Sequence, residues 1–188
     1  RFVVSVSTAA NPTMHAARYR DLEISASDWG EVGLLQTPSA RMAPAGEART
    51  HFSGIYPYTR GTVMLQPLDW LEAGFRYTDI ANRLYGPSIA GDQTYKDKSI
   101  DLKLRLREET ACGPQLALGL RDLGGTGLFS GEYLVASKRL GDFDLSAGLG
   151  WGYLGARGNI KAPLAFLGDE FKVRLGSDNA SGGTTNTQ

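Results

Sequence analysis

The feature that most constrains the fold of this sequence is the strict alternation of apolar and charged residues over positions 99–107. Leucine or isoleucine occupies every second position from 100 to 106, and the positions between them carry a charge. Successive side chains of a β-strand point to opposite faces, so this segment predicts a strand with one apolar and one charged face. A helix would scatter the same leucines around its circumference.

The same period of two recurs along the chain, with breaks between the alternating segments. No segment with a helical period is convincing, and residues 28–48 are rich in Gly, Pro and Ala and are expected to be irregular. The sequence therefore predicts an all-β protein made of successive antiparallel hairpins, with about 8–10 strands. The alternating segments are 63–65, 71–77, 116–121, 133–138, 145–153 and 171–175, with weaker ones at 17–27 and 47–56. Short connections are expected near 66–70, 109–114 and 140–143, and longer ones near 81–98, 122–128 and 155–170.

Composition excludes several classes of protein. Lys plus Arg and Asp plus Glu both number 20, so the zero net charge argues against a nucleic-acid partner. Two His and one Cys are too few for a zinc site made of these residues alone, and we expect no metal or other cofactor. One thiol also allows no intrachain disulfide. The 24 glycines suit turns and bends of a strongly curved sheet.

Two kinds of β-protein alternate in this way. In a soluble sandwich the apolar face meets a second sheet, whereas in an outer-membrane barrel it meets lipid and the other face lines the lumen. The chain has no run of 18 apolar residues, but a barrel strand needs only about ten residues, of which every second one is apolar. Strands of about ten residues and a mixture of small and charged residues on the other face favour the barrel. Aromatic residues near strand ends would form its membrane-interface girdle: Trp70, Tyr77, Trp151 and Tyr153.

We therefore predict an antiparallel up-and-down transmembrane β-barrel, or the N-terminal part of one. The barrel domain is expected over residues 28–176, after an N-terminal segment of uncertain structure at 1–27 and before a flexible C-terminal segment at 177–188. The first residue is Arg, and we expect the chain to be a piece of a longer protein.

Basic residues are expected to gather on the lumen side of the barrel. They are either a positive lining that attracts an anionic polysaccharide, or structural partners of Asp101, Glu72 and Glu132; structural pairing is favoured. The candidate lumen-lining residues are Arg76, Lys103, Arg105, Arg107, Arg121 and Lys138.

Other motifs offer weaker chemistry. Residues 150–155 match G-x-G-x-x-G, but they lie in an alternating segment with no expected helix behind them, so barrel glycines are the favoured interpretation. His15 and His51 carry no G-x-S-x-G nucleophile elbow with them, and we expect ordinary surface or loop histidines and no catalytic residue. Aromatic residues of the long loops could stack on sugar rings: Tyr85, Tyr95, Phe129 and Phe166.

Five segments, taken in order, resemble the YjbH/GfcD family of exopolysaccharide and capsule export proteins. They are residues 29–42, 68–80, 95–107, 121–138 and 149–155. The resemblance covers residues 28 to about 160, whereas residues 1–27 match no pattern of the family. It implies the N-terminal part of a longer β-barrel protein of the outer membrane of a Gram-negative bacterium. Many members are lipoproteins, whereas Cys112 here lies mid-chain beside an expected turn.

The function expected from these observations is that of a non-enzymatic outer-membrane β-barrel protein that supports exopolysaccharide or capsule export. Its partners would be outer-membrane lipid, polysaccharide and other proteins of the export system. Two alternatives stay open, namely a barrel-borne hydrolase acting on lipid or glycan, and a soluble β-sandwich binding module.

Overall fold

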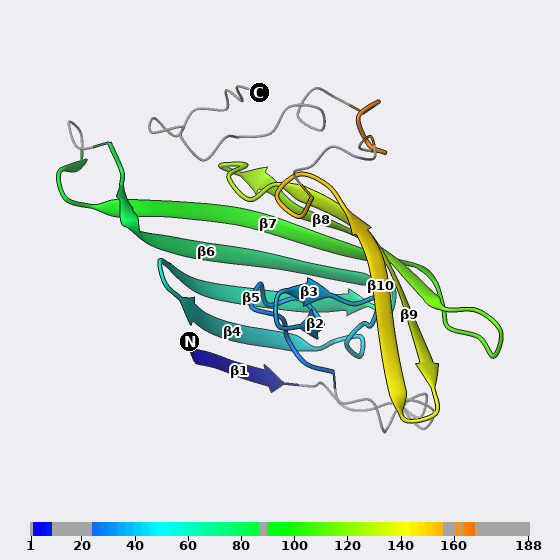
Figure 1. Cartoon of the computed structure of the whole chain (residues 1–188). Helices are drawn as coiled ribbons and strands as arrows, with labels where there is room; N and C mark the ends of the chain where they lie inside the picture. The colour runs from blue at the N-terminus through cyan, green and yellow to red at the C-terminus, as the bar shows by residue number, and fades with distance from the viewer. Residues whose placement is uncertain (1, 9–23, 87–89, 156–160, 162, 168–188) are drawn as a thin grey trace.

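The computed structural model describes residues 2–8, 24–86, 90–155, 161 and 163–167, the first range by its backbone (Figure 1). The expected strand at 171–175, the segment 177–188, His15 and most of the weak strand at 17–27 lie outside these residues. Within the described ranges, no helix is long and apolar enough to cross a membrane.

Eight strands form one antiparallel sheet in the order β1-β4-β5-β6-β7-β8-β9-β10. From β4 onward each strand pairs with its neighbour in sequence, which confirms the expected succession of hairpins. Strands β2 (Gly33–Leu34) and β3 (Thr37–Pro38) form a separate small pair. The strands of the large sheet are β1 (Phe2–Thr8), β4 (Ala48–Ile55), β5 (Tyr58–Leu68), β6 (Leu71–Leu84), β7 (Thr94–Arg107), β8 (Gln115–Gly125), β9 (Gly131–Leu140) and β10 (Phe143–Gly150).

The short connections lie where the alternation breaks, at 69–70, 108–114 and 141–142. The connection expected over 81–98 is narrower, because the pairing of β6 with β7 continues outward to Leu84 and Thr94. Likewise β8 runs through most of the expected loop at 122–128, as far as Gly125. Alternation of side chains identified the strands, but it missed their ends, where pairing continues although apolar and polar residues no longer alternate.

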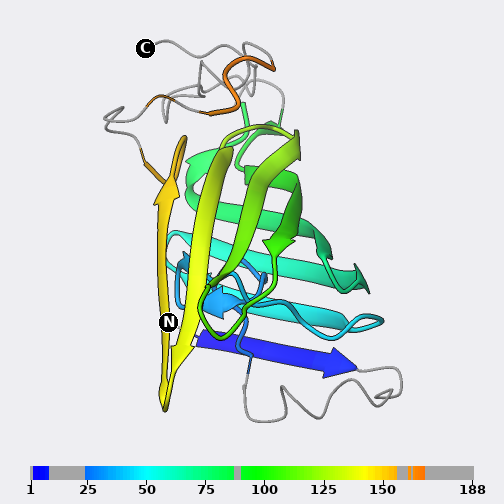
Figure 2. The same ribbon diagram turned by 90° about the vertical axis from the view of Figure 1, so that its right-hand side faces the viewer.

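The sheet curls into half of a barrel. Figure 2 shows β9 and β10 standing steeply against β1 and β4, with the small β2–β3 pair inside the hollow. Strands β1 and β10 are the two edges of the sheet and do not pair with each other. The all-β antiparallel architecture is thus confirmed, and the described residues form a curled sheet.

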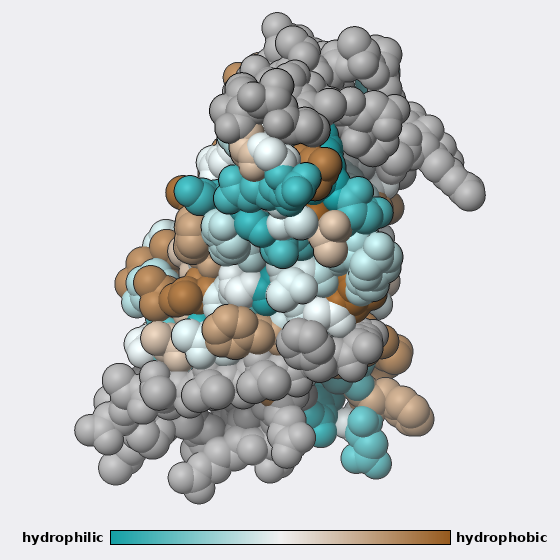
Figure 3. Space-filling model, turned by 90° about the vertical axis from the view of Figure 1, so that its left-hand side faces the viewer, coloured by the Kyte–Doolittle hydropathy of each residue, from teal (hydrophilic) through white to brown (hydrophobic). Residues whose placement is uncertain are grey.

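The two faces of this sheet differ in chemistry. The convex face carries apolar residues, many of them exposed, whereas the concave face carries buried polar and charged residues. We call the outward-facing apolar residues the convex band. Its members are Phe52, Val63, Leu65, Leu71, Ala73, Phe75, Tyr77, Ile100, Leu102, Leu104, Leu106, Leu116, Leu118, Leu120, Leu134, Ala136, Leu145, Ala147 and Leu149. Figure 3, viewed from the β6–β7 loop, shows hydrophilic residues in the middle and hydrophobic ones toward both flanks.

Residues 24–47, which we call the inner segment, lie against the concave face (Figure 1). As expected, most of this segment is irregular, and β2 and β3 are its only strands. Two small apolar clusters join it to the sheet. One contains Trp29, Ile80, Tyr95 and Phe129, and the other contains Ala40, Ala117, Tyr133 and Val135.

Two glycines make room for large side chains on the concave face. A Cβ added at Gly119 would collide with the ring of Tyr133, which lies across it from the neighbouring strand. A Cβ at Gly74 would collide with the sulfur of Met64 in the same way. These glycines therefore serve close packing across strands rather than turns.

Candidate functional site

The candidate site is the interface between the inner segment and the concave face, and Trp29 stands at its centre. Three guanidinium groups surround the indole, with the Cζ atoms of Arg60, Arg76 and Arg121 at 4.5, 4.6 and 4.7 Å from the ring centroid. They come from β5, β6 and β8, so one side chain of the inner segment contacts three separate strands. Cation–π contacts of this kind contribute about 0.5–2 kcal/mol each.

Glu31, two residues after Trp29, also joins the inner segment to the sheet. Its carboxylate forms an ion pair with Arg121 and accepts a hydrogen bond of 2.9 Å from the Tyr133 hydroxyl. Burial on its own would raise the pKa of Glu31, but Arg121, Lys103 and the Tyr133 hydroxyl together lower that pKa below its ordinary value. Glu31 is therefore a buried, ionised carboxylate of the inner segment that lies against the concave face of the sheet.

Glu72 on β6 is a second buried acidic residue of the site. It forms ion pairs with Arg49 and with Lys103, the latter with an Nζ–Oε2 distance of 2.6 Å. It also accepts a hydrogen bond of 3.0 Å from the backbone N–H of Val32, whose carbonyl accepts one of 3.0 Å from Lys103 Nζ. One carboxylate and one ammonium of the sheet thus satisfy both backbone groups of a buried residue of the inner segment.

Arg41 fastens the other end of the inner segment. Its guanidinium donates two hydrogen bonds to Asp144, of 2.6 and 3.0 Å, and further bonds to Glu109 at 2.6 Å and Gln115 at 3.1 Å. Burial would raise the pKa of Glu109, but hydrogen bonds from Arg41, the Arg139 backbone N–H and a lysine side chain lower it to about 2. This Arg41 clamp joins the segment to the β7–β8 connection and to β10.

Backbone groups of the inner segment also meet side chains of the sheet directly. Ser53 Oγ donates to the carbonyl of Asp28 at 2.8 Å, and Ser137 Oγ accepts from the N–H of Ala40 at 2.8 Å. Together with the ion pairs, these contacts reach every strand from β4 to β10. These contacts hold the inner segment against the sheet: Glu31, Glu72 and Arg41 are in ion pairs, and Arg60 lies against the rings of Trp29 and Tyr58.

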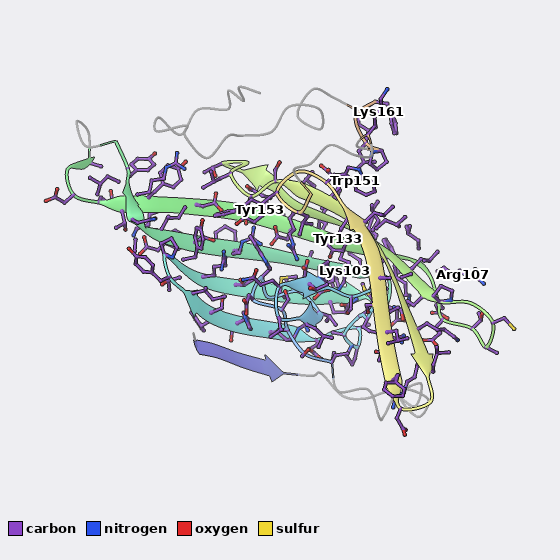
Figure 4. All side chains as sticks on the ribbon, viewed as in Figure 1. Lys103, Arg107, Tyr133, Trp151, Tyr153 and Lys161 are labelled. Carbon is purple, nitrogen blue, oxygen red and sulfur yellow. The ribbon has the colours of Figure 1, made fainter. Side chains whose placement is uncertain are left out.

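Three of the six expected lumen-lining residues come together here. Arg76, Lys103 and Arg121 are buried on the concave face, and Arg76 forms an ion pair with Asp101. Figure 4 shows Lys103 and Tyr133 directed toward the inner segment. Lys103 pairs with Glu72 and Arg76 with Asp101, and both acidic residues are among the structural partners that we considered for these basic residues.

The other three lie elsewhere. Arg105 is partly exposed and pairs with Glu108 at 2.8 Å, and Arg107 is exposed at the end of β7 (Figure 4). Lys138 alternates with the buried Ser137, so it stands on the convex side of β9, where its ammonium contacts Glu109 at 3.0 Å. Alternation places Tyr133 and Val135 inward on this strand, although their apolar character suggests the opposite.

The expected interface aromatics divide in a similar way. Trp70, Tyr77 and Tyr153 are exposed, whereas Trp151 is 8% exposed. Tyr153 also contacts the buried cluster, because its ring centroid lies 5.6 Å from that of Trp29. Both Trp151 and Tyr153 follow the end of β10 in the chain (Figure 4).

The loop aromatics considered for sugar stacking also separate into two groups. Tyr85 and Phe166 are exposed, whereas Tyr95 and Phe129 are buried at 3% and 2% exposure. Phe129 packs edge-to-face on Trp29 with a centroid distance of 5.5 Å. Two of the four side chains are thus part of the apolar cluster around the inner segment.

The expectation that His51 is a surface or loop residue is wrong. It lies on β4 with 0% exposure, and neither ring nitrogen has a hydrogen-bond partner among the described residues. It faces inward because it alternates with Phe52 of the convex band.

Residues 150–155 form a tight turn with a bridge between Gly152 and Gly155. Within the described ranges, no three His, Cys, Asp or Glu residues are grouped to hold a metal ion.

Sequence reasoning missed the residues that fasten the inner segment. Trp29, Glu31 and Arg41 lie in the stretch expected to be irregular, and no period marks them. The available signal was chemical: a large aromatic and two charged residues stand within a Gly-, Pro- and Ala-rich stretch, beside strands whose charged faces need partners.

Comparison with known proteins places this arrangement in context. The sequence profile of a family described as “Exopolysaccharide biosynthesis protein YbjH” matches residues 25–188. The chain is also 51% identical over 166 residues to a protein of Escherichia coli (strain K12) named “Uncharacterized lipoprotein YjbH”. The match covers 87% of this chain and 24% of that relative, so the chain spans about a quarter of the relative's length. No solved structure matches the chain significantly.

Proposed function

We propose that this chain, which belongs to the YjbH family of exopolysaccharide biosynthesis proteins, is part of a transmembrane β-barrel in the outer membrane of a Gram-negative bacterium. In this proposal the convex band contacts lipid, and the inner segment fills part of the lumen. The protein supports export of exopolysaccharide or capsule without catalysing a reaction.

The observation that carries the proposal is the inverted chemistry of the sheet. The middle of the convex face carries no charged residue, and the charged residues of that side, such as Lys98 and Lys138, lie toward the strand ends. The concave face instead buries Arg49, Arg76, Lys103 and Arg121. In water, a sheet with one free face turns its polar side outward and buries its apolar side. A lipid-facing barrel does the reverse, because hydrocarbon does not solvate charge and the lumen is polar.

Exposed aromatic residues at both ends of the strands support the same proposal. Trp70 and Phe143 lie at the end of the sheet that carries the β5–β6 and β9–β10 connections. Tyr56, Tyr77 and Tyr153 lie toward the opposite end, which carries the β4–β5 and β6–β7 connections. Aromatic side chains prefer the two membrane–water interfaces, so two such groups separated by an uncharged band suit a spanning sheet.

The interior supports an anchoring and assembly role for this part of the protein rather than an open polysaccharide path. Several of its charges are paired with one another or with the inner segment, as in Lys103 with Glu72 and Arg121 with Glu31, and Arg60 lies against the Trp29 ring. Contact with glycan or with other export proteins then falls to exposed loop residues such as Tyr85 and Phe166.

The alternatives receive less support from the same residues. A soluble sandwich needs a second sheet over the convex band, and the only other sheet among the described residues is the β2–β3 pair, which lies on the concave side. A hydrolase needs a reachable base, and His51 is buried within the fold.

The proposal is tested by expressing the full-length protein in a Gram-negative host and fractionating the envelope. We expect recovery in the outer-membrane fraction, extraction only with detergent, and gel mobility that changes on heating. Recovery in the soluble periplasm without detergent would refute the barrel.

Two matched variants refine the test. Val63→Asp places a charge in the convex band, and Ala111→Asp places one in the exposed β7–β8 connection. We expect Val63→Asp to lower the amount of heat-modifiable protein in the outer membrane severalfold and Ala111→Asp to leave it unchanged. Equal amounts for both variants would show that the band does not meet lipid.

A further inference from the structure

An exposed lysine lies just beyond the apolar convex band. On β6 the band ends at Tyr77, and Lys98 lies opposite Tyr77 on β7. Both side chains are exposed, whereas the neighbouring pair toward the middle of the sheet, Phe75 with Ile100, is apolar. Lys98 is therefore the first charged residue that follows the band on these two strands at their β6–β7 end.

Two glycines leave Tyr77 and Lys98 uncovered at their sides. Gly61 on β5 lies opposite Tyr77, and Gly124 on β8 lies opposite Ile100, diagonally next to Lys98. Among the described residues, a Cβ added at Gly124 would meet only Ile100 within 4 Å, so the surface there is open. A molecule that lies along the convex face can therefore reach the Lys98 ammonium and the Tyr77 ring from the side.

The charge of Lys98 is not used within the described part of the chain. Its ammonium forms no ion pair and no hydrogen bond with another described residue. Two residues farther out on the same face, the ammonium of Lys96 pairs with the carboxylate of Asp79, which also accepts a hydrogen bond of 2.6 Å from the Thr94 hydroxyl. Lys96 and Asp79 neutralise each other, so the positive charge of Lys98 is left over.

A lysine at the opposite end of the convex face differs from Lys98 in this respect. Lys138 on β9 pairs with Glu109 at 3.0 Å and donates hydrogen bonds of 2.6 and 3.2 Å to the carbonyls of Thr110 and Ala111. Its charge is therefore satisfied by the β7–β8 connection. Of these two lysines, Lys98 is the one whose ammonium is left to bind a group outside the described chain.

The surroundings of Lys98 fit a ligand with an anionic group and a long apolar part. The ammonium supplies a positive charge and three N–H donors, and the Tyr77 hydroxyl supplies another donor at the same level of the sheet. Toward the middle of the sheet, Phe75 and Ile100 continue as apolar surface. Tyrosine prefers the membrane–water interface, and a lysine there lays its apolar stem along hydrocarbon while its ammonium stays in the polar layer.

We propose that Tyr77 and Lys98 bind the phosphate of a membrane-lipid headgroup, whose acyl chain lies along the convex band beside Phe75 and Ile100. The inference rests on the proposed function, because only a band in contact with lipid meets headgroups at its end. The ligand is a lipid rather than free phosphate or an acidic glycan, because the cationic group and the apolar surface are continuous on the same two strands.

The test titrates lipid onto the full-length protein in detergent and counts the bound lipids by native mass spectrometry. The probes are phosphatidylglycerol and lipid A, in separate titrations, and diacylglycerol, which lacks the phosphate. For the phosphate-bearing probe that the unchanged protein binds more tightly, we expect Lys98→Gln to weaken binding about fivefold and Lys98→Arg to retain it. Diacylglycerol should bind equally to the unchanged protein and to Lys98→Gln. Equal affinity of these two proteins for the phosphate-bearing probe would overturn the inference.

The matched control is Lys138→Gln, which removes a lysine of the convex side that is already bound to Glu109. We expect its lipid affinity to be unchanged, and a loss equal to that of Lys98→Gln would show non-specific attraction and overturn the inference. Displacement of the bound lipid by inorganic phosphate or by a hyaluronan oligosaccharide would also overturn it, because either result would assign a different occupant.

Failure of the inference and failure of the proposed function are distinguishable. Gel mobility that changes on heating reports folding of each variant, and replacing the unpaired Lys98 is expected to leave that mobility as it is. Folded, detergent-dependent protein with equal lipid affinity in both forms would refute the Lys98 site alone. Protein that stays soluble without detergent would refute the proposed function instead.

Discussion

The two faces of a single strand show the central contrast in this molecule. Phe75 and Arg76 are neighbours on β6, yet Phe75 is 48% exposed and Arg76 is 0% exposed. The apolar residue lies on the outside and the charged residue on the inside, which is the reverse of a soluble sheet. The stability of the concave face therefore depends on partners within the protein, whereas that of the convex face depends on the solvent or lipid around it.

The stability of the two faces should therefore respond to different changes. Inside, ion pairs such as Arg121 with Glu31 are enclosed, so losing one partner leaves a buried charge without compensation. Outside, an apolar side chain gains stability only if the surroundings are hydrocarbon. The following predictions separate the two effects, beginning with the largest.

Removing the acidic centre of the concave face should have the largest effect. We expect Glu72→Leu to lower the free energy of unfolding by about 3–5 kcal/mol, because Arg49 and Lys103 would lose their shared carboxylate in a buried setting. The matched control on the same strand is Asp79→Ala, which breaks a partly exposed pair with Lys96 and should cost less than about 1 kcal/mol. Urea unfolding in detergent measures both; similar losses would contradict the contrast between buried and exposed pairs.

Placing a charge on the convex band should have the next largest effect, and only in lipid. Phe75→Arg is expected to destabilise the protein in bilayers by about 2–4 kcal/mol, because its side chain would enter hydrocarbon. If the convex face met water, the same change at an exposed site would stay within about 0.5 kcal/mol. Unfolding in vesicles measures the difference, and a loss within the smaller range would argue for a water-facing band.

A smaller effect is expected where the inner segment meets the sheet through one hydroxyl. Tyr133→Phe should cost about 1–3 kcal/mol, because a carboxylate oxygen of the buried Glu31 would lose its hydrogen bond. Tyr77→Phe removes a hydroxyl from the convex side and serves as the control. Equal and negligible losses in denaturant unfolding would show that Glu31 does not need this bond.

The smallest effect concerns pH and the Arg41 clamp. The pKa of Glu109 is about 2 in the folded chain and near 4.5 when unpaired, so the folded state favours the carboxylate. Its contribution is complete above about pH 4.5 and is lost as the pH falls toward 2. Glu109→Gln should therefore flatten the acid dependence of stability between these values. An unchanged acid profile would show that the pair with Arg41 contributes nothing.

Much of the sheet could be predicted from sequence because its signal is local. Alternation over residues 99–107 fixes which side chains of β7 share a face, and Leu102 and Lys103 lie on opposite faces as expected. The same rule led us to expect Lys138 on the lumen side of β9, whereas Tyr133 and Val135 point inward there and Lys138 lies on the convex side. The cause is local packing: the Tyr133 ring needs the space that Gly119 leaves on the neighbouring strand.

The candidate site was less predictable because its contacts join distant parts of the chain. Arg41 reaches Asp144 across 103 positions, and Ala40 reaches Ser137 across 97. No local period marks such partners, and a Gly- and Pro-rich stretch resembles an ordinary loop until the sheet curls around it. Trp151 illustrates the same limit, since its position at a strand end did not reveal that it is buried.

The sequence by itself determined an antiparallel all-β chain, the order of its hairpins and the existence of one apolar and one charged face, because these follow from the period of the strand. Only the tertiary structure decided which residues partner the charged face. The reason is that burial of charge requires partners: some come from a neighbouring strand, as Asp101 does for Arg76, and others from an inner segment whose Glu31 and Arg41 meet the sheet only after it has curled.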